Sequence, residues 1–388
     1  MSSLDELIAE LCPNGVEYKK IFEVSTVTIG EFVHKNKQND SAPYPVYNGG
    51  ISNTGYYNEY NRTANKIIIS ARGANAGFVN RVFTKYWSGN SCYTIDVNSN
   101  QLDWNFAYYW LKNHELKLLS DQQKGGIPAV SKKQVENFPI PIPPLPVQNE
   151  IVRILDNFTE LTAELTAELT ARKKQYEYYR SKILHLSKLT ETKTLGEACD
   201  FVRGPFGGSL KKEIFTKDGY AVYEQQHAIY GEFKFRYFVD EQKYKEMERF
   251  SVKPGDLIMS CSGTMGKIAI IPDDAPKGII NQALLKLTPK EGVNNRFLKY
   301  CFEDSIAAQM NFNARGGAIK NVASVAVLKD IKIQIPAIDE QLRVVALLDR
   351  FDILCNNITT GLPAEIEARQ RQYEYYRDEL LTFKEANA

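Results

Sequence analysis

The chain of 388 residues has no long hydrophobic run and few of the residues that build metal or redox sites. Its apolar stretches are broken within about ten residues, whereas a bilayer-spanning helix needs roughly 20. The first residues have neither a basic segment nor an apolar core, so we expect no signal peptide, no membrane partner and a cytoplasmic location. The six cysteines stand singly beside only four histidines, which argues against a zinc site or a disulfide framework.

Catalytic signatures are also missing. No glycine-rich nucleotide motif opens a helix, and the stretch that ends in Gly266 and Lys267 resembles a P-loop only superficially, because Cys261 replaces the first glycine and Ile268 the Ser or Thr. The Asn-Pro-Pro-aromatic tetrapeptide of adenine methyltransferases does not occur. We therefore expect a recognition and scaffold protein with no catalytic residue, metal or cofactor of its own. The formal charge of +1 neither favours nor excludes DNA as a partner.

An internal duplication is the main feature that is present. The hexapeptide Gln-Tyr-Glu-Tyr-Tyr-Arg at 175–180 returns unchanged at 372–377. Other residues of the first half recur in the same order, and at nearly constant spacing, in the second half. We infer a chain built twice, in the order globule, helix, globule, helix. The recurring pairs are Asn90 and Asn281, Phe106 and Phe297, Tyr109 and Tyr300, Gln148 and Gln341, and Phe158 and Phe351.

Each globule shows a mixed pattern of strands and helices. In the first, short β-branched and aromatic runs predict strands at Tyr44–Tyr47, Lys66–Ser70 and Tyr93–Val97, followed by a helix at Phe106–Leu119. The predicted fold class is α+β, with two tandem mixed α/β domains separated and joined by long helices that form an antiparallel, pseudo-two-fold symmetric coiled coil. The predicted domains are 1–142 and 191–335 for the globules, and 143–190 and 336–388 for the helical segments.

The helical segments differ in one respect. From Ile151 apolar residues recur every three or four positions without Gly or Pro, which predicts a rod of about 54 Å at 1.5 Å per residue. In the second segment Gly361 and Pro363 predict a helix, a tight turn and a second helix. The Thr-Ala-Glu-Leu repeat of the first segment is good helix sequence, and we expect it to act also as a spacer of adjustable length. Its leucines are Leu161, Leu165 and Leu169.

The two hexapeptides contain more tyrosine than one buried helical stripe holds, and the first lies in a locally basic segment. We expect some of these tyrosines to pack against the other hexapeptide copy. The rest are expected to contact partner proteins, since aromatic side chains are enriched at interfaces. The candidate interface residues are Arg172, Tyr176, Tyr178, Tyr179, Tyr373, Tyr375 and Tyr376.

Two similar globules held by paired helices suit a partner that has two-fold symmetry of its own. A DNA duplex with two short half-sites is one such partner, and each globule would then enter one groove. The duplication alone leaves two other classes open. One is a stand-alone DNA-binding regulator, and the other is a non-catalytic adaptor that clamps a protein or a glycan.

Several motifs occur twice in the same order. A Gly-Gly loop and a proline-containing exit lead into a glutamine-containing helix at 143–158 and again at 336–351, beside the stretch Leu257–Gly266 and the hexapeptides. Over the whole chain this order resembles the specificity subunit of type I restriction-modification enzymes. The resemblance implies two target-recognition domains for the two halves of a bipartite double-stranded DNA sequence. It also implies docking of two methyltransferase subunits and, through them, two restriction subunits, with S-adenosylmethionine, ATP and Mg²⁺ on those partners.

Side chains with forked or cationic ends on glycine-bounded loops are the candidates for DNA contact, because such groups bind base edges or phosphates. The first globule departs from the family pattern, with Ile69–Gly77 in place of the Ser-Gly-Thr-Xaa-Gly pattern kept at Ser262–Gly266. Base contacts are therefore not transferred from the resemblance. The candidates are Arg72, Asn75 and Lys124 in the first globule, and Gln225, Gln226, Lys267 and Arg315 in the second.

Overall fold

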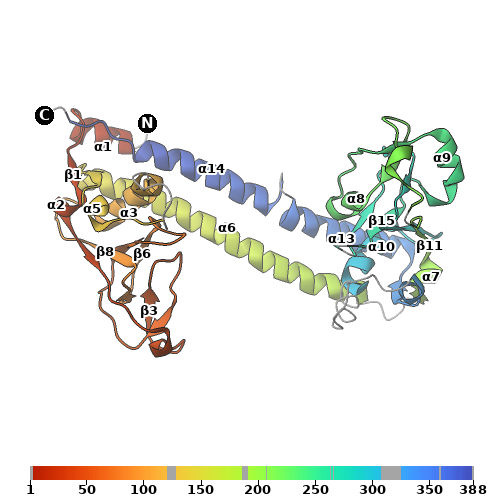
Figure 1. The fold of residues 1–388 in the computed structure, drawn as a ribbon, viewed down its shortest axis with the longest axis horizontal. Coiled ribbons are helices and arrows are strands. Elements are labelled where there is room, and N and C mark those ends of the chain that lie inside the picture. Colours follow the sequence, from red (N-terminus) through yellow and green to blue (C-terminus); the bar gives the residue numbers. More distant parts are fainter. Residues whose placement is uncertain are drawn as a thin grey trace. The chain divides into compact units, whose positions relative to one another are not determined.

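The chain forms two compact units in the computed structural model (Figure 1). The first unit combines Met1–Thr166 with Glu365–Ala388, and the second comprises Ala167–Ala364. Within the described parts of the chain, no helix is both long and apolar enough to cross a membrane. The structure describes residues 3–119, 128–185, 191–206, 208–262, 264, 266–306, 325–357 and 360–386.

In its described residues, the globule of the first unit is built on three sheets. Its strands are β1 (Tyr18–Lys20), β2 (Ser25–Ile29), β3 (Tyr44–Tyr47), β4 (Gly55–Tyr57), β5 (Lys66–Ser70), β6 (Val79–Val82), β7 (Trp87–Ser88), β8 (Cys92–Val97) and β9 (Pro139–Pro141). The largest sheet is antiparallel with the order β2-β8-β5-β6, the second has the order β4-β3-β7 with β3 and β7 parallel, and β1 pairs with β9. The three predicted strands are therefore confirmed as β3, β5 and β8.

Short helices surround these sheets. They are α1 (Ser3–Leu11), α2 (Ile21–Val24), η1 (Lys35–Lys37), α3 (Trp104–Asn113), α4 (Glu115–Leu119) and α5 (Lys132–Glu136). The prediction of one helix over 106–119 is wrong, because the chain leaves the helical path at His114. The Glu115 carboxylate accepts the backbone N–H of Val79 at 2.6 Å, so a tertiary contact redirects the segment.

The second unit repeats the sheets of the first. Its strands are β10 (Glu191–Thr194), β11 (Cys199–Arg203), β12 (Tyr220–Tyr223), β13 (Phe238–Val239), β14 (Ser251–Val252), β15 (Leu257–Ser260), β16 (Ile268–Ile270), β17 (Gly278–Ile280), β18 (Leu284–Pro289) and β19 (Lys332–Ile335). The order β11-β18-β15-β16 matches β2-β8-β5-β6, the parallel pair β12 and β17 matches β3 and β7, and β10 pairs with β19 as β1 does with β9. The predicted duplication is thus present in the sheet topology.

The second unit differs from the first around its parallel strand pair. Strand β13 pairs with β12 as β4 pairs with β3, and β14 pairs with β17 where the first unit has a single bridge between Arg62 and Tyr86. Among the described residues, the second unit also has two additional helices, α8, which packs against β15 and β16, and α9. Its shorter helices are α7 (Leu195–Ala198), η2 (Lys212–Ile214), α8 (Gln225–Tyr230), α9 (Glu241–Glu246), η3 (Glu248–Phe250), α10 (Asn295–Cys301), the π-helical turn η4 (Phe302–Ile306) and α12 (Val325–Lys329).

Three long helices complete the units: α6 (Leu145–His185), α13 (Ile338–Asn356) and α14 (Leu362–Leu380). Helix α6 begins before the predicted Ile151, since Pro146 is tolerated in a first helical turn. The predicted helix, turn and helix are confirmed as α13 and α14, and the N–H of Gly361 bonds to the carbonyl of Asn357 at 3.0 Å.

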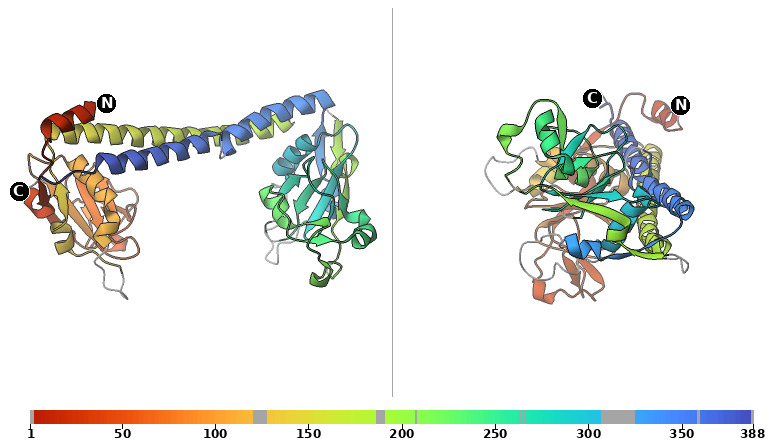
Figure 2. Two further views of the ribbon diagram at one scale, coloured as in Figure 1. Left: turned by 90° about the horizontal axis from the view of Figure 1, so that it is seen from above. Right: turned by 90° about the vertical axis from the view of Figure 1, so that its right-hand side faces the viewer.

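In each unit the helices pair antiparallel (Figure 1, Figure 2). In the first, α6 leaves the globular core from its N-terminal end, where Ile151 and Leu155 are buried, and α14 brings Leu381 into the same core. In the second, α6 enters the core with Tyr176 and Leu184, and α13 leaves it after Leu348, with Phe351 packed against its edge. Each unit therefore contains its own globule, the helix that follows that globule, and the hexapeptide helix of the other repeat. The predicted fold class is confirmed.

Candidate nucleic-acid interface and docking helices

In the first unit, the strand order brings two loops to one end of the four-stranded sheet. Ile29, Tyr93 and Ile69 form one row across β2, β8 and β5. Because β2 and β5 run in the same direction through their shared antiparallel neighbour, the loops that follow them leave the sheet side by side. We call residues 30–37 and 71–78 the first loop edge.

Two predicted DNA-contacting residues lie on the first loop edge. Arg72 is exposed, while its backbone is fixed by a bridge to Ala129. Asn75 is partly exposed, and its carbonyl accepts the N–H of Phe78 at 3.1 Å. Gly77 ends the turn with φ +81°, a conformation that favours glycine. The loop is thus held by backbone bonds, and the Arg72 side chain is available to a partner.

The second unit has an equivalent edge, formed by the described residues of 203–213 and 261–267, which we call the second loop edge. Lys267 is exposed there, and Gly266 has φ +76°. Backbone bonds of 2.9 Å join Ser260 to Gly266 and to Lys267, and Ser70 makes the same pair of bonds in the first unit. The two edges are therefore built on one backbone pattern.

Gln225 and Gln226 were predicted on a loop, and that placement is wrong. They form the first turn of α8, whose N-cap residue is Glu224, and the Glu224 N–H donates to Nδ1 of His227 at 2.8 Å. Gln225 nevertheless reaches the second loop edge. The Ser262 hydroxyl donates to its Oε1 at 2.8 Å, and its Nε2 donates to the Ser262 carbonyl. The amide therefore already has partners within the chain.

Lys124 and Arg315, with the Gly-Gly loops that contain them, lie outside the described residues. Of the other candidates, Arg72 and Asn75 lie on the first loop edge, Lys267 lies on the second, and Gln225 contacts the second. Gln226 is the exception. That they contact DNA stays a prediction.

A buried glutamine attaches the first globule to its long helix, a role that sequence reasoning missed. Oε1 of Gln148 accepts the N–H of Asp103 at 2.8 Å, and its Nε2 donates to the carbonyls of Gln101 at 2.7 Å and Pro143 at 2.6 Å. The amide has no exposed surface, yet both its groups are paired. Asp103 caps α3, so Gln148 joins the start of α6 to the start of α3.

Gln341 repeats this arrangement in the second unit. It accepts the N–H of Asn294, the N-cap of α10, and donates to the carbonyls of Gly292 and Pro336, each at 2.8 Å. The sequence did contain a signal for this role. In both repeats a proline-containing segment precedes a helix with an apolar stripe, and a glutamine lies about one turn after the start of that helix.

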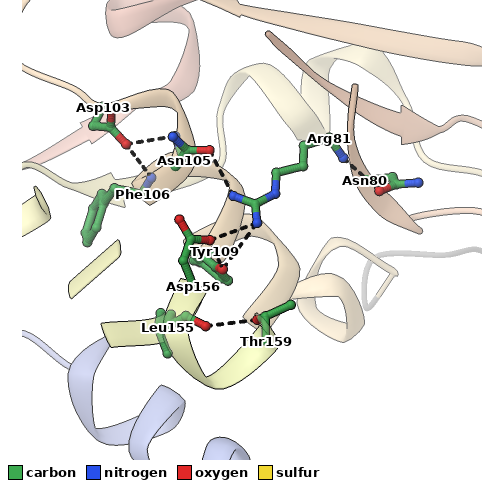
Figure 3. Close-up of polar contacts among 9 residues, drawn as sticks. All are labelled: Asn80, Arg81, Asp103, Asn105, Phe106, Tyr109, Leu155, Asp156 and Thr159. Atoms are coloured by element: carbon green, nitrogen blue, oxygen red, sulfur yellow. Dashed lines mark hydrogen bonds and ion pairs between the residues drawn. The ribbon is translucent and has the colours of Figure 1, made fainter. Parts of the chain in front are cut away.

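A second junction lies about two helical turns further along each helix. In the first unit the Asp156 carboxylate accepts the Tyr109 hydroxyl at 2.5 Å and pairs with Arg81 at 2.9 Å (Figure 3). Asn105 holds the same guanidinium at 2.9 Å. In the second unit Asp349 accepts the Tyr300 hydroxyl at 2.7 Å.

The tyrosines of the first hexapeptide divide into a buried and an exposed set. Tyr176 is buried and stacks on Phe351 of α13, with ring centroids 6.0 Å apart. Burial raises the pKa of the Tyr176 hydroxyl to about 12. Tyr178 is 54% exposed, and Tyr179 is also exposed. Tyr176 therefore belongs to the core of the second unit, whereas its two neighbours are open to a partner.

In the second hexapeptide two tyrosines contact the facing helix without being fully buried, since Tyr373 is partly buried and Tyr376 is 38% exposed. Tyr376 stacks on Phe158 at 5.7 Å, and Tyr373 packs on the same ring at 6.4 Å. Tyr375 is 65% exposed. The expectation that tyrosines pack against the other hexapeptide copy is thus corrected for these residues. Their partner is a phenylalanine of the facing helix, because antiparallel helices bring the start of one beside the end of the other.

The remaining helical candidates lie on the surface to different degrees. Arg172 is already paired with Glu168 at 3.4 Å along α6. Leu161 is exposed, and Leu165 and Leu169 are partly buried, so the spacer leucines form a shallow stripe. Over the part of the chain that the structure describes, no group of three or more His, Cys, Asp or Glu side chains is arranged to hold a metal ion.

Comparison with known proteins shows the family to which the chain belongs. A family model described as the type I restriction modification DNA specificity domain matches residues 13–172 and 188–368. The chain therefore belongs to the type I restriction-modification specificity subunits, and its two globules are target-recognition domains. The predicted family is confirmed.

Individual relatives extend over nearly the whole chain. It is 32% identical over 387 residues to a Haemophilus influenzae protein described as a type I restriction enzyme specificity subunit, covering 95% of this chain and 96% of that one. A specificity subunit of Escherichia coli is 34% identical over 293 residues, 72% and 70% of the two chains. The crystal structure of an S subunit from M. genitalium has a TM-score of 0.58 at 17% identity, covering 95% and 96% of the two chains.

Proposed function

We propose that the two loop edges bind double-stranded DNA, each at one half of a bipartite target. The observation that carries this proposal is that one backbone pattern recurs in both globules while the side chains on it differ, Arg72 and Asn75 on one edge and Lys267 on the other. A repeated frame with different polar ends suits two half-sites of unequal sequence, because base identity is recognised by side-chain donors and acceptors.

The long helices supply the scaffold part of this function. The exposed Tyr178, Tyr179 and Tyr375 would dock two methyltransferase subunits, and two restriction subunits would join through them. The chain itself would carry out no chemistry. S-adenosylmethionine, ATP and Mg²⁺ would be bound by those partners, and the complex would act in the cytoplasm.

The test is co-expression with the products of the neighbouring genes, followed by mapping of methylated adenines. We expect a two-part motif, and Arg72→Ala should relax only one half of it, while Lys267→Ala should relax only the other. Arg153→Ala, on an exposed arginine of α6 that pairs with Glu150, should leave the motif unchanged.

Binding measurements separate this function from the alternatives. The complex should bind a duplex containing the motif with an affinity that falls steeply as salt rises. Specific binding by the isolated chain alone would favour a stand-alone regulator. An affinity for DNA that does not depend on salt, or no affinity, would favour an adaptor.

A further inference from the structure

Each loop edge carries an exposed phenylalanine at the same topological place. Phe32 follows β2 and is 56% exposed, and Phe206 follows β11 and is 91% exposed. A single exposed phenyl ring needs no explanation. An exposed ring at the same place in both globules does need an explanation, because β2 and β11 are equivalent strands and the loops of the two globules otherwise differ.

A glycine two residues earlier fixes where each ring projects. A Cβ atom at Gly30 would lie 2.0 Å from the Ser88 carbonyl oxygen, and one at Gly204 would lie 1.9 Å from that of Asn281. Neither site accepts a side chain without moving the backbone. The N–H groups of the two glycines donate to the first residues of the neighbouring strands β8 and β18, at 3.2 and 2.9 Å. Both loops therefore leave the sheet in the same manner.

Basic side chains accompany both rings. Lys35 and Lys37 are exposed after Phe32, against one exposed acid, Glu31. Around Phe206, one exposed acid, Glu213, faces a larger basic set: Arg203, Lys211 and Lys212. An apolar tip with a surplus of cations beside it suits a partner that offers both stacked rings and phosphates.

We propose that Phe32 and Phe206 are paired DNA contacts that insert against a base step in each half-site and do not select the base. This proposal rests on the proposed function of the loop edges. A phenyl ring has no donor or acceptor with which to distinguish base pairs, and its stacking tolerates any base. The same ring can therefore serve two globules that recognise different sequences, and it contributes to affinity and to local unstacking of the duplex.

The test uses the full chain assembled with its methyltransferase subunits. The probes are a duplex carrying the mapped motif, with 2-aminopurine placed at successive positions of each half-site, and a scrambled duplex of the same length. The variants are Phe32→Ala, Phe206→Ala and the corresponding Phe→Trp changes. Phe22→Ala is the matched control, since Phe22 is 53% exposed but lies in α2, before the opposite end of β2.

We expect each Phe→Ala change to weaken binding about ten-fold on both duplexes, so that the ratio between them stays constant, as loss of one stacking contact predicts. The 2-aminopurine fluorescence of the affected half-site should fall, Trp should restore both readouts, and Phe22→Ala should change neither. Unchanged affinity in the Ala variants, or a changed ratio, would overturn the proposal. If the wild-type complex fails to prefer the motif duplex, the proposed function itself fails.

Discussion

The first unit supplies Asp156 with a guanidinium from strand β6, whereas the second supplies Asp349 with one from helix α10. Arg296 stands two residues after the N-cap of α10, the place that Asn105 has in α3. The tyrosine that donates to the carboxylate is equivalent in the two units. The duplication has therefore kept the carboxylate and its hydroxyl donor, while the cation comes from different elements.

The buried glutamines should give the largest effect, and an equal one in both units. Gln148→Leu or Gln341→Leu leaves one N–H and two carbonyl groups without their partner, which should cost about 3 kcal/mol of unfolding free energy. Urea unfolding of the complete chain measures this, and each change should shift the transition of its own unit. Gln370→Ala on the exposed face of α14 is the control. A large effect in one unit alone would break the equivalence.

Replacing Arg81 and replacing Arg296 should lower the free energy of unfolding by different amounts. The Arg81 side chain is 15% exposed and also lies over the Tyr108 ring, whereas Arg296 is 60% exposed. Arg81→Met should therefore cost about 2 kcal/mol, and Arg296→Met less than about 0.5 kcal/mol, since solvent screens the exposed pair. The same urea experiment checks both values. Equal losses would mean that exposure does not separate the two junctions.

The exposed tyrosines test the helices outside the cores. Tyr178→Ala and Tyr375→Ala should each weaken docking of a methyltransferase subunit by about 1–2 kcal/mol, as removal of an aromatic interface residue does. Size-exclusion chromatography of the co-expressed subunits would show partly dissociated complexes. Tyr230→Ala, at an exposed tyrosine of α8, should elute like the wild type. Unchanged assembly in all three variants would exclude these tyrosines from docking.

Lengthening the Thr-Ala-Glu-Leu spacer should change the length and twist of α6 and have the smallest effect on stability. One added Thr-Ala-Glu-Leu unit after Leu169 lengthens α6 by about 6 Å and turns it by about 40°. Because a base pair rises roughly 3.4 Å, we expect the unrecognised gap to grow by one or two base pairs while both half-sites are kept. Mapping methylated adenines checks this. Altered half-sites, or an unchanged gap, would contradict it.

Much of the architecture was predictable because its signals are local. The strands β3, β5 and β8, the break before α14 and the duplication follow from residue patterns a few positions long. The polar junctions were not predictable, since Arg81 and Asp156 are far apart in the sequence and only the tertiary fold joins them. The placement of Gln225 failed for a related reason. Its helix has six residues and begins at a glutamate cap, so no apolar period marks it.

Each unit contains the hexapeptide helix of the other repeat, and this arrangement sets the order in which the two units can be completed during synthesis on the ribosome. The second unit needs only residues 167–364, but the first needs both its N-terminal globule and the helix from 365 onward. Val16 forms a β-bridge with Glu385, near the other end of the chain. A chain emerging from its N-terminus therefore has all of the second unit before it has all of the first. The N-terminal globule is synthesised first, but its unit is completed last. Until α14 has been synthesised, the phenyl ring of Phe158 lacks Tyr373 and Tyr376, which pack on it in the folded chain.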